Sequence, residues 1–117
     1  NELNSLALQG VGSATVVDFV QTHNGADDGI EFYGGTVDAK HLLITGTDDD
    51  GLDWTHGYVG RIQHVLIDST NSGDNCIEAD NLGSNPICPR NDRHPSGMAA
   101  CQLSVSVFLQ RPTKRTL

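Results

Sequence analysis

Short apolar segments alternate with turns rich in Gly, Asn and Asp along this chain. Three of these segments, at 15–20, 38–44 and 61–67, are six or seven residues long and rich in Val, Ile and Leu. Their length and β-branched composition predict strands. No stretch keeps a 3.6-residue hydrophobic period, so we expect almost no helix.

One acidic phrase recurs after the strands. It reads Asp-Asp-Gly-Ile-Glu-Phe at 27–32, Asp-Asp-Gly-Leu-Asp-Trp at 49–54 and Asp-Asn-Cys-Ile-Glu-Ala at 74–79. Self-similarity at such a regular spacing is typical of a solenoid in which each repeat forms one coil. The sequence therefore predicts an all-β fold, a short right-handed parallel β-helix (solenoid) of three to four coils.

Equivalent residues of successive coils should stack. Ile30, Leu52 and Ile77 are expected to form one inward column. Gly29 and Gly51 stand at the sharp turn, where we expect positive φ. A second inward column is expected from three residues of the longer strands, namely Phe19, Leu42 and Val65.

The repeat pattern stops near Pro86, which divides the chain. Residues 1–85 are expected to form the coils. Residues 86–117 are expected to form a divergent Pro-containing loop, one strand at 101–110 and a basic C-terminal tail that acts as a cap.

Charge is unevenly distributed. Residues 1–89 carry 14 acids and only two bases, whereas residues 90–117 carry five bases and one acid. An acidic body without a cationic surface argues against nucleic-acid partners, and the absence of a long apolar run argues against membrane insertion. The same acidity would attract divalent cations.

In stacked coils the acids would form three ladders. Like charges at about 5 Å repel by roughly 3 kcal/mol at an effective dielectric of 20, so a cation or protons should offset them. Ca²⁺, which takes six to eight oxygen ligands, fits this chemistry; the alternative is a solvated acidic edge. The candidate metal ligands are Asp27, Asp28, Glu31, Asp49, Asp50, Asp53, Asp74 and Glu78.

Histidines suggest a second site. Asp18, His41 and His64 recur at equal intervals along the chain and should share a column. Such a column would hold a transition metal or form a polar ladder.

Catalysis by carboxylates on neighbouring coils is a further hypothesis, because β-helix glycosidases use such groups. The candidate catalytic residues are Asp28, Asp49, Asp50, His56 and Arg61. The order of these residues is suggestive of such a set, but the sequence motifs of other hydrolases are missing from the chain.

Aromatic residues near the acidic turns are candidates for carbohydrate binding. Phe32 and Trp54 end the first and second copies of the acidic phrase and should align, with Tyr58 close by. The alternative is an aromatic stack within the core.

Three cysteines, Cys76, Cys88 and Cys101, form no C-x-x-C pair, which argues against structural zinc. They are disulfide candidates in an oxidising compartment, or buried thiols.

The phrase Asp-Asp-Gly-Ile-Glu-Phe-Tyr-Gly-Gly-Thr-Val at 27–37, with its echoes at 48–54 and 77–81, resembles a bacterial group of exported right-handed β-helix repeat proteins, mostly without an assigned activity. The resemblance implies an extracellular or cell-envelope location.

Three functional hypotheses result. The first is an exported or cell-surface β-helix protein acting as a structural or binding module, stabilised by Ca²⁺, with carbohydrate as a partner. The second is a polysaccharide hydrolase or lyase. The third is a self-assembling extracellular filament subunit, because strand edges at the ends of a solenoid invite end-to-end stacking.

Overall fold

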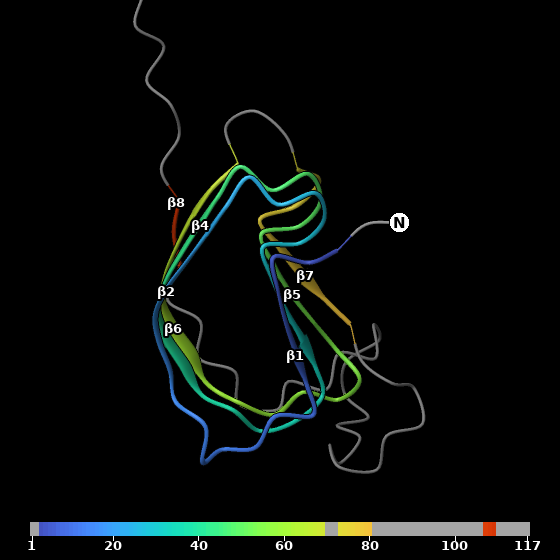
Figure 1. Ribbon diagram of the computed structural model, residues 1–117, viewed down its shortest axis with the longest axis vertical. Helices are drawn as coiled ribbons and strands as arrows, with labels where there is room; N and C mark the ends of the chain where they lie inside the picture. The colour runs from blue at the N-terminus through green and yellow to red at the C-terminus, as the bar shows by residue number, and fades with distance from the viewer. Residues whose placement is uncertain (1–2, 70–72, 81–106, 110–117) are drawn as a thin grey trace, which may run out of the picture.

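The computed structural model describes residues 3–69, 73–80 and 107–109, and these residues form a parallel β-helix (Figure 1). None of the described residues is helical. This confirms the predicted all-β solenoid. The strands are β1 (Leu6–Gln9), β2 (Val17–His23), β3 (Ile30–Tyr33), β4 (Ala39–Thr45), β5 (Leu52–Thr55), β6 (Ile62–Asp68), β7 (Ile77–Ala79) and β8 (Val107–Leu109).

The strands form two parallel sheets that face each other across the core. One sheet has the order β1-β3-β5-β7 and the other has the order β2-β4-β6-β8. Each coil adds a short strand to the first sheet and, in the first three coils, a seven-residue strand to the second. We call the levels β1/β2, β3/β4, β5/β6 and β7/β8 the first to fourth coils. The view along the solenoid shows turns joining the two sheets (Figure 1).

The predicted column of Ile30, Leu52 and Ile77, the first residues of β3, β5 and β7, is confirmed. Ile30 pairs with Leu52, and Leu52 pairs with Ile77, in parallel register. Ile30 and Leu52 are fully buried. Because each coil repeats the same apolar position, one continuous core runs along the solenoid axis.

The second predicted column is wrong by one residue. Val20, not Phe19, pairs with Leu42, which in turn pairs with Val65, and Phe19 is 79% exposed. The cause is an unequal spacing of the coils: Val20 pairs with Leu42, 22 residues later, whereas Leu42 pairs with Val65, 23 residues later, so equal intervals select Phe19 by mistake. Each long strand also contains a left-handed residue, at Phe19, His41 and His64, with φ of 54°, 51° and 60°. This residue interrupts the alternation of inward and outward side chains, so the buried positions in β4 are Ala39, Leu42 and Ile44.

Gly29 and Gly51 are needed for a different reason from the one predicted. Neither is among the residues with positive φ. A Cβ at Gly29 would lie 2.3 Å from Ile44 Cγ2 and 2.5 Å from the Gly51 carbonyl oxygen. A Cβ at Gly51 would lie 2.8 Å from the carbonyl oxygen of Cys76. Neighbouring coils therefore approach too closely here for any side chain.

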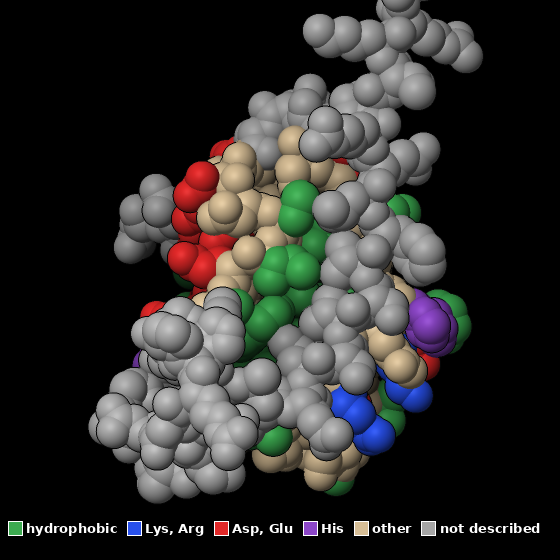
Figure 2. All heavy atoms as spheres, turned by 180° about the vertical axis from the view of Figure 1, so that it is seen from behind, with side chains coloured by type: hydrophobic (Ala, Val, Ile, Leu, Met, Phe, Trp, Pro, Cys, Tyr) green, Lys and Arg blue, Asp and Glu red, His purple; other side chains and the backbone are tan. Residues whose placement is uncertain are grey.

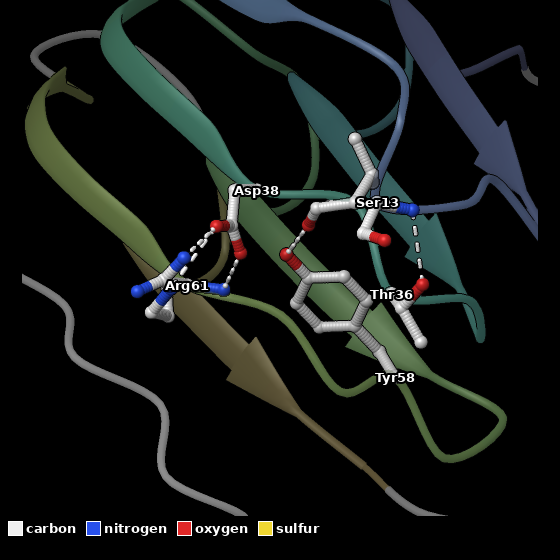
Figure 3. Close-up of polar contacts among 6 residues, drawn as sticks. Ser13, Thr36, Asp38, Tyr58 and Arg61 are labelled. Atoms are coloured by element: carbon white, nitrogen blue, oxygen red, sulfur yellow. Dashed lines mark hydrogen bonds and ion pairs between the residues drawn. The ribbon is translucent and has the colours of Figure 1, made fainter.

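The opposite end of the short strands is closed by a polar corner (Figure 3). The buried Tyr58 hydroxyl donates a hydrogen bond of 2.6 Å to the Val37 carbonyl. The exposed Arg61 guanidinium pairs with Asp38, which lowers the pKa of that carboxyl below its usual range. A hydrogen bond from the Ser13 amide to Thr36 Oγ1, at 3.0 Å, ties the first coil to the second.

Only part of the predicted C-terminal strand lies within the described residues. There, β8 pairs in parallel with β6 and so continues the second sheet. The predicted Pro-containing loop and basic tail lie outside the described residues. Across the described ranges no helix has the length and apolar character required to span a membrane.

Candidate metal centre

Acidic side chains gather along the edge of the solenoid where the turns enter β3, β5 and β7. In the space-filling view, several Asp and Glu side chains gather on one side of a strip of hydrophobic side chains, and the Lys and Arg side chains lie on the other side (Figure 2). The register pairs Glu31 with Asp53 and Asp53 with Glu78. Repetition of the acidic phrase thus becomes a set of stacked carboxyls.

Asp28 and Asp50 join the coils through their side chains. Asp28 Oδ1 accepts a hydrogen bond of 3.1 Å from the backbone N–H of Asp50. Asp50 Oδ1 accepts one of 2.7 Å from the backbone N–H of Asn75. Each buried aspartate therefore satisfies a backbone donor of the next coil, which explains an acceptor side chain at this position.

Three carboxyl groups, one of them that of Asp28, form a buried cluster beside these hydrogen bonds. Asp28, Glu31 and Asp53 are 8%, 6% and 8% exposed, and one carboxylate oxygen of each lies within 4.8 Å of the others. Asp53 Oδ1 is buried and has no hydrogen-bond partner among the described residues. A buried acceptor without a partner costs free energy, so the cluster has an unmet requirement for a proton or a cation.

Burial dominates the electrostatics of this cluster. Desolvation raises the pKa of Asp28 to about 7, opposed by the hydrogen bond from the Asp50 amide and reinforced by the neighbouring acids Asp27, Glu31 and Asp50. Desolvation also raises the pKa of Asp53 to about 7, assisted by hydrogen bonding with Glu31. Each group is therefore poised between its neutral and charged forms near neutral pH.

Two polar side chains of the first two coils contact Glu31. The Asn4 side-chain amide donates a hydrogen bond to Glu31 Oε2. A hydrogen bond with Glu31 also raises the pKa of Tyr33 to about 12. Neither Asn4 nor Tyr33 was predicted from the sequence, although extending the column of Asp28 and Asp50 back by one coil would have found Asn4.

Two further carboxyl clusters, which we call the rim clusters, contain more exposed side chains, and they share Asp49. Asp27, Asp28 and Asp49 form one, and Asp49, Asp50 and Asp74 form the other, each with ligand atoms within 4.8 Å of one another. Glu78 belongs to neither, but a hydrogen bond with Asp50 raises its pKa. The structure thus places all eight predicted metal ligands along one edge.

The predicted catalytic set is divided between two ends of the short strands. Asp28, Asp49 and Asp50 lie in the acidic turns that precede β3 and β5. His56 follows β5, and six residues of extended chain span about 20 Å. Arg61 lies beyond the next corner and is paired with Asp38. These two basic side chains therefore do not join the acids.

Two of the three rings predicted to bind carbohydrate are core residues. Phe32 is fully buried and Tyr58 is 7% exposed, and their ring centroids are 4.7 Å apart. Because a buried ring cannot stack on a sugar in solvent, their role is packing. Trp54, which pairs with Phe32 in register, is half-buried.

The predicted histidine column contains Phe19 in place of Asp18. Phe19 stacks on His41 at a centroid distance of 4.5 Å, and His41 stacks on His64 at 5.1 Å. Asp18 pairs with Lys40 in the sheet, and its Oδ1 lies 2.7 Å from His41 Nδ1. The trio Asp18, His41 and His64 is not among the groups of described residues with converging ligand atoms.

Of the cysteines, only Cys76 lies within the described residues. It is a free thiol, with its Sγ 3.9 Å from Ser69 Oγ. Cys88 and Cys101 lie outside the described residues, so their predicted pairing stays a prediction.

Residues 1–94 match the model of the pectate-lyase-like beta helix domain. The chain belongs to this family. Comparison with curated proteins and with solved structures gives no match. In this pectate-lyase-like β-helix domain, the carboxyl clusters therefore have to be interpreted from their own geometry.

Proposed function

We propose that this β-helix domain is a calcium-binding structural or binding module, with the primary site formed by Asp28, Glu31 and Asp53. The supporting observation is the meeting of three carboxyls, each more than nine-tenths buried, with an Asp53 oxygen that has no hydrogen-bond partner among the residues that the structure describes. Two oxygens bound to one Ca²⁺ lie at most about 5 Å apart, so the spacing within 4.8 Å suits a common ion.

The chemistry of the donors favours Ca²⁺ over other metals. All candidate ligands are carboxylate oxygens, whereas Zn²⁺ prefers sulfur and nitrogen and Mg²⁺ requires near-ideal octahedral geometry. The rim clusters share Asp28 and Asp49 with their neighbours. Further ions along the edge would therefore offset the repulsion between stacked acids.

An exported location is part of this proposal. Extracellular calcium modules bind their ions with dissociation constants of about 10⁻⁴ to 10⁻³ M. A site that must first lose protons from groups with a pKa of about 7 is suited to such weak binding. Carbohydrate remains the proposed external partner, with Trp54 as the half-buried ring available to it.

Calorimetric titration of the 117-residue chain with CaCl₂ at pH 8 tests the proposal. Binding heat is expected for the wild-type chain, and Asp53→Asn should weaken binding at least tenfold because it removes a charged ligand. Asp48→Asn is the matched control, since Asp48 is exposed and belongs to none of the carboxyl clusters. No binding heat from the wild-type chain, or equal losses in both variants, would refute the site.

A polysaccharide hydrolase or lyase is the second candidate. Its support is the family match together with two neighbouring carboxyls whose pKa values are about 7, a value suited to general acid–base work at neutral pH. Incubation with polygalacturonate should then yield new reducing ends or unsaturated products. Retention of that activity in Asp28→Asn would exclude this cluster as the catalytic site.

A further inference from the structure

The first coil, formed by residues 3–23, exposes apolar surface. The large hydrophobic side chains that are exposed in the described part of the chain are Leu3, Val16 and Phe19, at 80%, 85% and 79%, and all three belong to this coil. Isolated exposed apolar residues are ordinary, but here all three lie at one end of the solenoid.

The core residues of the same coil are less buried than those of the second coil. Leu6 and Val20 are partly buried, whereas their partners in the second coil, Ile30 and Leu42, are at most 2% exposed. Strands β1 and β2 are the edge strands of both sheets. Within the described part of the chain, no strand pairs with the outer edge of β1 or β2, and partly buried core residues lie beside these edges, an arrangement that promotes strand addition.

The acidic columns end in neutral residues at this coil. Ala7 pairs with Glu31, and the same register places Asn4 beside Asp28 and Leu3 beside Asp27. At the opposite end, the fourth coil continues these columns with Glu78, Asn75 and Asp74. An acidic end and a neutral, apolar end thus stand at the two extremes of one register.

We propose that the first coil docks against the fourth coil of a second copy of this chain, head to tail and in parallel register. In this arrangement β1 and β2 of one copy continue the sheets beyond β7 and β8 of the other. Leu3 then lies beside Asp74, Asn4 beside Asn75, and Ala7 beside Glu78. No junction position brings two acids of these columns together, so this contact avoids the like-charge repulsion that two fourth coils would meet, and it continues the parallel register of both sheets.

The ring column supports the same direction of growth. Phe19 ends the stack of Phe19, His41 and His64, and one face of its ring packs on His41. A contact between two different surfaces of one chain does not close on itself in a straight solenoid. Repetition of the junction therefore builds a filament, and four coils of about 4.8 Å each give an axial repeat of about 19 Å.

Sedimentation velocity of the 117-residue chain over a concentration series, in EDTA, tests this inference independently of Ca²⁺. The wild-type chain should associate as concentration rises. Leu3→Glu should weaken association about tenfold, because it places a carboxylate beside Asp74, whereas Leu3→Lys should keep or strengthen it through attraction to the same residue. Lys40→Glu, a change on the exposed side of the second coil, should have no effect.

Thermal melting followed by circular dichroism would establish that the variants fold, as expected for a side chain that is 80% exposed. Electron microscopy of the associated sample should show rods with the four-coil repeat. A wild-type chain that stays monomeric at every concentration overturns the proposal. Equal weakening by Leu3→Glu and Leu3→Lys also overturns it, since it would indicate apolar association without this register.

Discussion

The backbone N–H of Asp50 donates a hydrogen bond of 3.1 Å to Oδ1 of Asp28, a residue one coil earlier. Asp50 repeats this relationship with the Asn75 amide at 2.7 Å. Asp50→Ala removes the acceptor and leaves the Asn75 N–H without it, whereas Asp50→Asn keeps an oxygen in place. We expect the free energy of unfolding of Asp50→Ala to be about 1–3 kcal/mol lower than that of Asp50→Asn. Urea denaturation of the two variants measures this difference. Equal stabilities would show that this bond does not hold the coils together.

Close approach of the coils at Gly29 predicts a steric cost. Gly29→Ala should lower the free energy of unfolding by about 1–3 kcal/mol, because its Cβ would meet Ile44 and the backbone of the next coil. Gly12→Ala is the control, since no atom lies within 4 Å of a Cβ built there. Chemical denaturation should place the control within about 0.5 kcal/mol of the wild type. A Gly29→Ala protein as stable as Gly12→Ala would contradict the coil spacing.

Tyr58 closes the polar corner with a buried hydrogen bond to the Val37 carbonyl. Tyr58→Phe keeps the ring packed on Phe32 but leaves the Val37 carbonyl without this donor. The expected loss of stability is about 1–3 kcal/mol. Urea denaturation measures it, and an unchanged midpoint would indicate that water replaces the hydroxyl.

The raised pKa values of Asp28 and Asp53 predict a pH dependence that is opposite to ordinary acid denaturation. Both groups bind protons more tightly in the folded state, with pKa values of about 7, than in the unfolded state, at 3.8. Stability from their neutral forms is therefore complete below pH 3.8 and is lost as the pH rises to about 7. The slope is about 1.4 kcal/mol per pH unit for each proton.

Denaturation in EDTA between pH 4 and pH 8 measures this contribution. The double variant Asp28→Asn/Asp53→Asn should gain stability relative to the wild type as the pH rises, because its amides carry no charge to desolvate. A difference between the two proteins that does not change with pH would show that these carboxyls titrate normally.

The sequence predicted the core of the short strands because the acidic phrase fixes their register. Ile30, Leu52 and Ile77 follow the same turn by the same number of residues in every copy, and the structure places them side by side. The long strands were harder to align. Val16 and Val17 are both apolar, and the first two long strands are offset by 22 residues whereas the next two are offset by 23, so a one-residue error leaves no mark in the pattern.

The part of the site that depends on the register of the coils could be predicted from the sequence. The stacking of Glu31, Asp53 and Glu78 follows directly from the repeat. The burial of the site does not follow from the repeat, because the low exposure of Asp53, 8%, depends on how neighbouring turns pack over it. The separation of His56 from the acids was within reach of the sequence, since the six residues from Asp50 to His56 span about 20 Å when the chain between them is an extended strand.

Calcium-dependent melting at two pH values tests the central claim most directly. Ca²⁺ binds the deprotonated carboxyls, so the increase in melting temperature on adding CaCl₂ should be larger at pH 8 than at pH 6. Asp53→Asn should abolish most of that increase, and Asp48→Asn should retain it. An increase that is absent from the wild-type chain at pH 8, or that survives in Asp53→Asn, would contradict a calcium centre at Asp28, Glu31 and Asp53.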